Sequence, residues 1–151
     1  MANRNFANMQ YSAVKGVVRL WARVSIGATG APTLSKWNPA TRTYSSAPTT
    51  GTGPYARGAE GIKSIARNDV GVYTLTLQDT YQRVLGFKAT FSNATGLPTI
   101  VAVGLWSAAT DVTAATPVIK FTTMSSTATA ADPANGDVMQ LEIELQNTAV
   151  I

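Results

Sequence analysis

Two glutamates near the end of the chain have a spacing that suits acid–base chemistry. Glu142 and Glu144 lie two positions apart in an alternating run. On an extended strand their carboxylates would share one face, about 6–7 Å apart. Glycosidases use carboxylate pairs at comparable separations. Exposed strand faces also carry glutamates for solubility, and no other pattern in the chain indicates a sugar cleft. We therefore expect neither glutamate to be catalytic.

The segment before these glutamates contains oxygen ligands for a hard cation. Asp132, Asn135 and Asp137 follow one another closely, and Ca²⁺ prefers ligands of this kind. Their spacing matches no EF-hand, and the same residue types dominate ordinary turns. The chain has no histidine and no cysteine, which excludes the commonest general base and all thiolate chemistry. We expect a protein that is not an enzyme and that holds no metal and no cofactor.

Basic and aromatic side chains are interleaved in the first half of the chain. Such sets can stack nucleic-acid bases and hold phosphates, but they are equally typical of protein interfaces. On the strand predicted for residues 17–26, the stems of Arg19 and Arg23 could instead cover Trp21, which would then pack on a second apolar layer. We take protein contact as the working interpretation and expect no direct nucleic-acid binding. The candidate interface residues are Arg4, Phe6, Tyr11, Arg19, Trp21, Arg23, Trp37, Arg42 and Tyr44.

The distribution of charge also points to a macromolecular partner. Charged residues make up only 13% of the chain, and the net charge is +4. Residues 1–75 contain nine lysines and arginines against two acids, whereas residues 76–151 contain three against six. A basic half of this kind suits an acidic partner, unless folding mixes the two halves. A hydroxyl-rich surface with few charges is common in proteins that pack against others.

Alternating hydrophobicity predicts strands along most of the chain. The clearest case is residues 71–92, where Tyr73, Leu75 and Leu77 share one face and Leu85, Phe87, Ala89 and Phe91 share another. Asp79-Thr80 between them is a turn signal, so we expect a hairpin with one apolar face. Similar alternation predicts inward-facing sets in two further strands, namely Val18, Leu20, Ala22, Val24 and Ile26, and Met139, Leu141, Ile143 and Leu145.

Shorter signals complete the set of elements. Residues 34–37 and 42–44 predict a small hairpin that turns at Asn38-Pro39 and pairs Trp37 with Tyr44. Residues 61–67 and 118–121 predict strands, and residues 107–110 a single helical turn. The continuous apolar run from Ile100 to Trp106 predicts a strand buried on both faces. No apolar run approaches the roughly 20 residues that a membrane-spanning helix needs.

Together these elements predict an all-β fold, either an antiparallel β-sandwich or a jelly-roll-like barrel. We expect an extended N-terminal arm over residues 1–16 and one β-sandwich domain over residues 17–151. Residues 27–61 are rich in Gly, Pro, Ser and Thr, and we expect them to form a long loop and hairpin excursion that touches a neighbour.

Three blocks of the sequence carry a family resemblance. They are GAPTL (Gly30 to Leu34), GIKSIARNDVGVYTLTLQDTYQRVLG (Gly61 to Gly86) and ADPANGDVMQLEIELQNTA (Ala131 to Ala149). With these blocks the chain resembles a group of structural proteins of tailed-bacteriophage virions, over roughly residues 16–150. Within that group it looks most like a capsid decoration, or cement, protein.

The resemblance implies a function on the capsid surface, after synthesis in the host cytoplasm. Cement proteins bind the outside of the expanded head, often as homotrimers, and clamp adjacent capsomers of the major capsid protein against the pressure of packed DNA. The partners implied are therefore the major capsid protein and other copies of the chain, with no membrane involved. Two alternatives stay open: a tail or tail-fibre adaptor, and a carbohydrate-binding β-sandwich in which Trp21, Trp37 and Tyr44 form a sugar platform.

Overall fold

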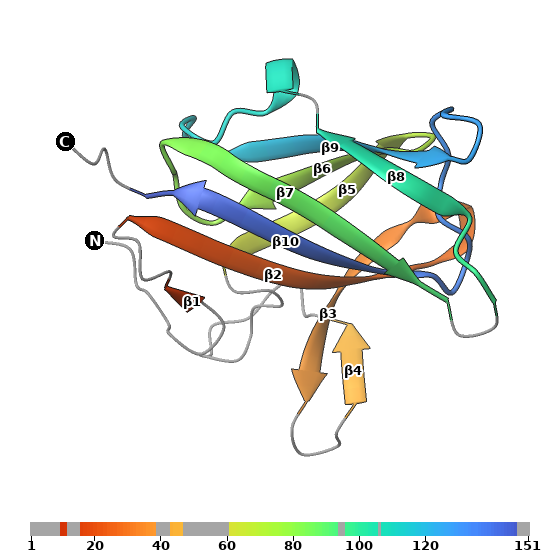
Figure 1. Cartoon of the computed structure of the whole chain (residues 1–151). Helices are drawn as coiled ribbons and strands as arrows, with labels where there is room; N and C mark the ends of the chain where they lie inside the picture. Colours follow the sequence, from red (N-terminus) through yellow and green to blue (C-terminus); the bar gives the residue numbers. More distant parts are fainter. Residues whose placement is uncertain are drawn as a thin grey trace.

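Two antiparallel β-sheets packed face to face form the body of the molecule (Figure 1). This computed structural model describes residues 10–11, 16–38, 43–46, 61–93, 96–105 and 107–147. The predicted all-β class and the β-sandwich are thereby confirmed. Sheet A has the strand order β4-β3-β2-β10-β7, with β1 also paired to β2, and sheet B has the order β5-β6-β9-β8.

The strands of each sheet come from distant parts of the chain. Sheet A contains β1 (Gln10–Tyr11), β2 (Val17–Ile26), β3 (Pro32–Asn38), β4 (Thr43–Ser46), β7 (Arg83–Ser92) and β10 (Val138–Gln146). Sheet B contains β5 (Ile62–Asp69), β6 (Val72–Leu77), β8 (Ile100–Leu105) and β9 (Val118–Ser125). Two short 3₁₀ turns are η1 (Ala28–Gly30) and η2 (Ser107–Ala109), and the second confirms the helical turn expected near residue 107.

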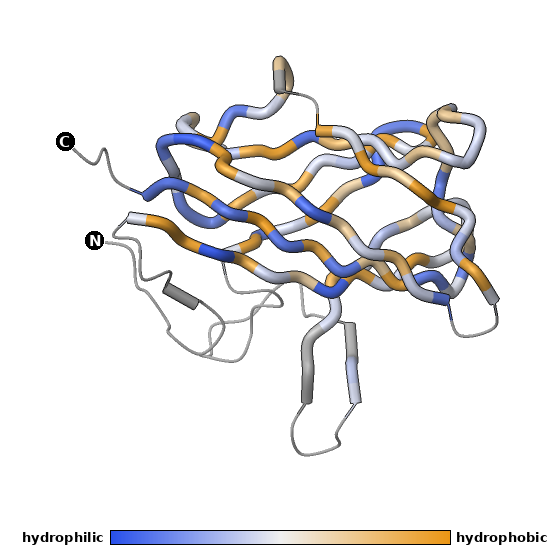
Figure 2. Tube along the Cα trace, viewed as in Figure 1, coloured by the Kyte–Doolittle hydropathy of each residue, from blue (hydrophilic) through white to orange (hydrophobic). Residues whose placement is uncertain are grey.

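The core lies between the two sheets and follows from strict alternation. On β2 and β10 every second residue is buried, as predicted, and Figure 2 shows the resulting alternation of hydrophobic and hydrophilic positions. Sheet B contributes Tyr73, Leu75 and Leu77 from β6 and Ile119 and Phe121 from β9. The rings of Tyr73 and Phe121 stack with centroids 5.6 Å apart. Full burial of each large apolar side chain contributes about 1.5–3 kcal/mol to stability.

The hairpin predicted between residues 73–77 and 85–91 is wrong. β6 and β7 belong to different sheets, so the segment between them crosses from sheet B to sheet A. The crossing is anchored by Tyr81, which is buried and whose N–H donates to the Val112 carbonyl at 2.8 Å. Each strand has an apolar face that must be buried, and two strands in opposite sheets satisfy this requirement as well as a hairpin does.

Two burial predictions on β7 and β8 also need correction. Leu85 is exposed because the register of β7 with β10 shifts at Glu144/Leu145, and Leu85 is the extra residue of that bulge. The run from Ile100 to Leu105 is not buried on both faces. β8 is an edge strand with a second bulge, and Val101 is 66% exposed there. Trp106, the end of the predicted run, lies outside the described residues.

The small hairpin of residues 34–44 is confirmed in its strand pairing. β3 pairs with β2 from Pro32↔Ile26 to Ser35↔Arg23, and then continues to pair with β4, where Trp37 lies opposite Tyr44. In Figure 1 the far ends of β3 and β4 extend beyond the body of the sandwich. The hairpin is thus continuous with sheet A, and it brings Tyr44 to the side of β2.

Gly71 lies in the tight β5–β6 turn, where its backbone closely approaches Thr123 and Ala131. Its substitution therefore tests how closely this end of the sandwich is packed. Its φ is +65°, and a Cβ there would lie 2.5 Å from Ala131 N and 2.7 Å from Thr123 O. Because strain and overlap with backbone combine, we expect Gly71→Ala to lower the free energy of unfolding by about 2–4 kcal/mol. Urea denaturation of the purified protein measures this change.

Two other glycines provide matched controls. Gly136 has a φ of +89°, but a Cβ added there would have no atom within 4 Å, so Gly136→Ala reports strain alone. Gly96→Ala has open space as well and no left-handed φ, and it should leave stability nearly unchanged. Equal losses for the Gly71 and Gly136 variants would contradict the close approach of the two backbones.

Candidate interaction surface

The outer face of sheet A carries an exposed pair of aromatic side chains beside arginines. On β2, Arg19, Trp21 and Arg23 alternate with buried residues and therefore point away from the core. Trp21 is 38% exposed and Tyr44 is 50% exposed. The Arg23 guanidinium lies over the Tyr44 ring, 4.0 Å from its centroid, which is a cation–π contact. We call Arg19, Trp21, Arg23 and Tyr44 the aromatic–arginine face.

The strand opposite adds carboxylates to this face. Arg19 Nε lies 2.6 Å from Glu144 Oε1, a close ion pair that lacks hydrogen-bond geometry. Glu142 pairs in register with Trp21 on one side and with Lys88 on the other. The two glutamates considered above for acid–base chemistry thus lie among cations and an indole on an open sheet face. Exposed ion pairs of this kind contribute little to stability, and their arrangement favours a recognition role.

One edge of β2 pairs with β10, and the opposite edge pairs first with β1 and then with β3. Trp21 lies between these last two pairings. β1 pairs with β2 at Val18 and Arg19, and β3 pairs with it from Arg23 to Ile26. Within the described residues, the stretch from Leu20 to Ala22 has no strand partner on that edge. The indole therefore lies beside a stretch of β2 that has no strand partner on this edge among the described residues.

The structure brings together only part of the predicted interface. Arg19, Trp21, Arg23 and Tyr44 share one face, although Tyr44 comes from a different strand. Tyr11 pairs with Val18 and Trp37 with Tyr44, but the structure describes these two residues only in their backbone pairing. Arg4, Phe6 and Arg42 lie outside the described residues. Glu142 and Lys88, which complete the face, were missed as interface candidates, although the alternation of residues 138–146 indicated that Glu142 faces outward.

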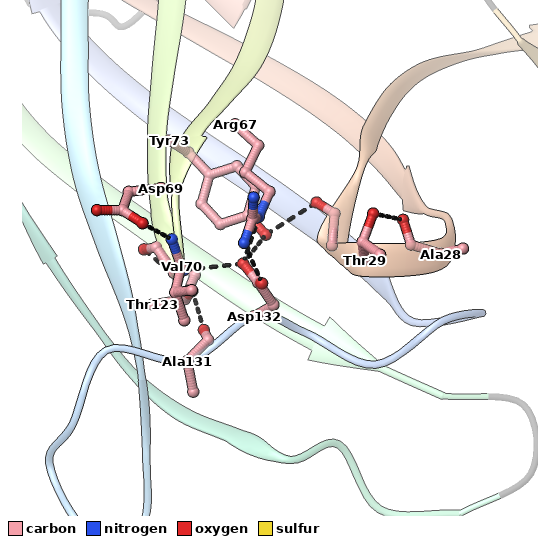
Figure 3. A network of polar contacts seen from close by, with 11 residues as sticks. Ala28, Thr29, Arg67, Asp69, Val70, Tyr73, Thr123, Ala131 and Asp132 are labelled. Atoms are coloured by element: carbon pink, nitrogen blue, oxygen red, sulfur yellow. Dashed lines mark hydrogen bonds and ion pairs between the residues drawn. The ribbon is translucent and has the colours of Figure 1, made fainter.

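A second group of polar residues lies at one end of the sandwich and centres on Asp132 (Figure 3). Arg67 Nε and Nη2 donate to the two carboxylate oxygens of Asp132 at 2.9 and 2.7 Å, a bidentate ion pair. The Gly71 N–H donates to Asp132 Oδ1 at 2.8 Å. The Tyr73 hydroxyl lies 3.0 Å from the Gly30 carbonyl oxygen and 3.3 Å from Asp132 Oδ1. One carboxylate therefore joins β5 and β6 to the segment before β10, and the Tyr73 hydroxyl extends the link to η1.

This arrangement accounts for the electrostatics of the Asp132 cluster. The Arg67 hydrogen bonds, followed by the Gly71 N–H, hold the pKa of Asp132 below its usual value against the opposing effect of burial. Burial, with the nearby Asp132 charge, raises the pKa of Tyr73 above its ordinary value. Tyr73 was correctly predicted to face inward, and a buried tyrosine hydroxyl needs a polar partner. The need of the buried Tyr73 hydroxyl for a polar partner was thus the one sequence signal that pointed to the Asp132 cluster.

Two of the three calcium ligands considered from the sequence, Asp132 and Asp137, are engaged with protein donors instead, whereas Asn135 is exposed. Asp132 is held as described above. Asp137 is fully buried, accepts a hydrogen bond from the Asn93 side-chain amide, and accepts the Ala134 N–H at 2.8 Å. Among the described residues, no group of three or more His, Cys, Asp or Glu side chains is placed to hold a metal ion. Both aspartates therefore fix the conformation of the loop that leads into β10.

Comparisons with protein-family models, curated proteins and solved structures find no match to this chain. Within the described part of the chain, no helix is long and apolar enough to cross a membrane.

The Asp132 cluster predicts a pH dependence of stability. Because the folded pKa is depressed, the stabilisation is fully present above the unfolded pKa of about 3.9 and is lost as the pH falls through the lower folded value. We expect Asp132→Ala to lower the free energy of unfolding by about 2 kcal/mol at pH 7, since it leaves buried donors unpaired. This difference from the wild type should shrink below about pH 4.

Urea denaturation at pH 7, 5 and 3 checks this expectation. Asp132→Asn keeps the shape of the side chain but cannot ionise, so its stability should lack the acid-dependent step at this site. An Asp132→Ala deficit that is as large at pH 3 as at pH 7 would show that the charge of Asp132 does not stabilise the fold.

Proposed function

We propose that this chain is a non-enzymatic structural protein of a phage virion that binds the outside of the expanded capsid. In this role it clamps neighbouring capsomers of the major capsid protein against the pressure of packed DNA. The observation that carries the proposal is the aromatic–arginine face, where Trp21 and Tyr44 are exposed on the outer side of sheet A next to Arg19 and Arg23. The family resemblance of the sequence blocks supports the capsid as the site of binding.

The physical properties of this face suit a protein partner. Tryptophan, tyrosine and arginine are the residue types most enriched at interface hot spots. Trp21 sits on β2, which is paired along its length with β10, and Arg23 already rests on Tyr44. Little conformational entropy is therefore lost when these side chains become immobilised on binding. Among the described residues on the outer face of sheet A, four basic side chains exceed two carboxylates (Arg19, Arg23, Arg83 and Lys88 against Glu142 and Glu144), which favours an acidic partner surface.

Binding to one state of the shell would stabilise that state by mass action. A protein that binds only the expanded lattice contributes RT ln(1 + [L]/Kd) at each site, and the contributions of many sites add. The homotrimer implied by the resemblance belongs to this proposal as the arrangement of copies bound to the capsid, since three copies around a local three-fold axis would contact three capsomers at once.

Substitution of Trp21 tests the proposal. We expect Trp21→Ala to weaken binding to purified empty expanded capsids at least about tenfold, because a hot-spot aromatic is removed. Co-sedimentation over a range of protein concentrations measures the affinity and the number of copies bound. Circular dichroism and thermal melting should show that the variant still folds, since Trp21 lies on the outer face.

Thr76→Ala is the matched control. Thr76 alternates with buried Leu75 and Leu77 and so lies on the outer face of sheet B, on the other side of the molecule. Its substitution should leave capsid binding unchanged. Failure of the wild-type protein to bind expanded capsids, with recovery in tail fractions instead, would replace the cement role with the tail role. A shift of tryptophan fluorescence with polysaccharide and not with capsids would indicate a sugar-binding module.

A further inference from the structure

The free edge of β8 differs from the edges formed by β5 and β7. β8 is the last strand of sheet B and pairs with β9 on one side only, among the residues that the structure describes. Ten consecutive residues, from 96 to 105, include no charged side chain. Figure 2 shows this strand as almost wholly hydrophobic. Leu97 is 94% exposed and Val101 66% exposed, and Leu105 at the other end of the strand is also exposed.

The neighbouring edges carry the usual protection against strand pairing. β7 has Arg83 and Lys88 on its exposed side and a bulge at Leu85. β5 has the charged residues Lys63, Arg67 and Asp69, together with two register shifts. Charges and bulges on edge strands prevent association with other chains. β8 has a single bulge at Val101, after which Ala102 to Leu105 pair regularly with β9.

The chemistry of this edge selects the kind of partner it fits. An unpaired strand edge offers N–H and C=O groups that only another strand can satisfy in a continuous ladder. Because the edge carries no charge, a charged partner strand would lose hydration without gaining an ion pair. A second copy of β8 meets both requirements. Antiparallel pairing of a strand with itself about a two-fold axis is self-complementary.

We propose that β8 pairs with β8 of a second copy and joins the two B sheets into one continuous sheet. If the axis passes near Val103, Val101 of one copy lies opposite Leu105 of the other. Apolar cross-strand pairs of this kind stabilise antiparallel sheets. Leu97, just before the strand, extends the apolar contact. The pairing does not depend on the proposed capsid role, because it uses the edge of sheet B and leaves the aromatic–arginine face open.

A charge placed on the edge should break this contact. We expect the wild-type protein to show a reversible monomer–dimer equilibrium in sedimentation velocity across a range of concentrations. Val101→Lys should raise the dimer dissociation constant at least about tenfold, because each lysine would bring an unpaired charge into the apolar contact opposite Leu105 of the other copy. Val101 is exposed in the monomer, so the variant should fold normally, as circular dichroism can verify.

Val70→Lys is the matched control. Val70 is also an exposed valine, 48% accessible, but it lies in the β5–β6 turn, away from β8. This variant should dimerise like the wild type. A wild-type protein that stays monomeric at all concentrations, or an oligomer of any size that Val101→Lys leaves intact, would overturn the proposal. Neither result bears on capsid binding, which the Trp21 variant tests separately.

Cross-linking locates the contact directly. The chain contains no cysteine, so a single cysteine introduced by Ala102→Cys on the β8 edge can react only with its copy in a partner chain. A short bismaleimide should produce a covalent dimer of Ala102→Cys, whereas Val70→Cys should give only the background of random collisions. Equal yields from the two variants would show that the copies do not meet along β8.

Discussion

The antiparallel pairing of β2 with β10 is the contact on which the rest of the structure depends. It runs from Val17↔Gln146 to Ser25↔Val138 and so joins the two ends of the described chain at the centre of sheet A. Both strands bury every second side chain, and together they form one wall of the core. β6 and β9 form the other wall of the core, and they can bury their apolar side chains only when the wall of β2 and β10 is in place. Because the central contact spans nearly the whole sequence, much chain entropy must be lost before the core forms, which is typical of slow and cooperative β-sandwich folding.

The Asp132 cluster fixes the relative position of the two sheets more narrowly than hydrophobic burial alone does. Hydrophobic burial is non-directional, whereas a bidentate ion pair and directed hydrogen bonds tolerate little displacement. Asp132 contacts Arg67, Gly71 and Tyr73 at one end of the sandwich. At the same end the Ile26 N–H donates to the Asp137 carbonyl at 2.9 Å, and the Gly136 N–H donates to the Ile26 carbonyl. These contacts fix how sheet B sits against the start of β10.

Alternation made the strands and their inward faces predictable, because side-chain direction in a strand depends only on position along the chain. The same property explains why Arg19, Trp21 and Arg23 were correctly placed on one outer face. Alternation contains no information on which sheet a strand joins, so β6 and β7 were wrongly paired. A continuous apolar run also looks alike in a central strand and in an unprotected edge strand, and β8 was therefore assigned to the interior. The link between Arg67 and Asp132 spans 65 residues, and no local pattern reports such a pair.

The surfaces of the sandwich divide into regions of different chemistry, and this division constrains how the molecule can be used. The outer face of sheet A holds aromatic rings, arginines and two glutamates, whereas the outer positions of β6 in sheet B are Val72, Thr74 and Thr76. Among the described residues, only the outer face of sheet A carries exposed aromatic rings, so a partner that needs aromatic contact can approach from one side only, which fixes the orientation of the bound molecule. The uncharged β8 edge lies at the margin of the other sheet, so the proposed contact between copies along β8 and the proposed contact with a partner through sheet A would not compete for the same residues. A protein with these two separate contacts can cross-link a surface: each copy binds the surface by one sheet and its neighbour by the edge of the other.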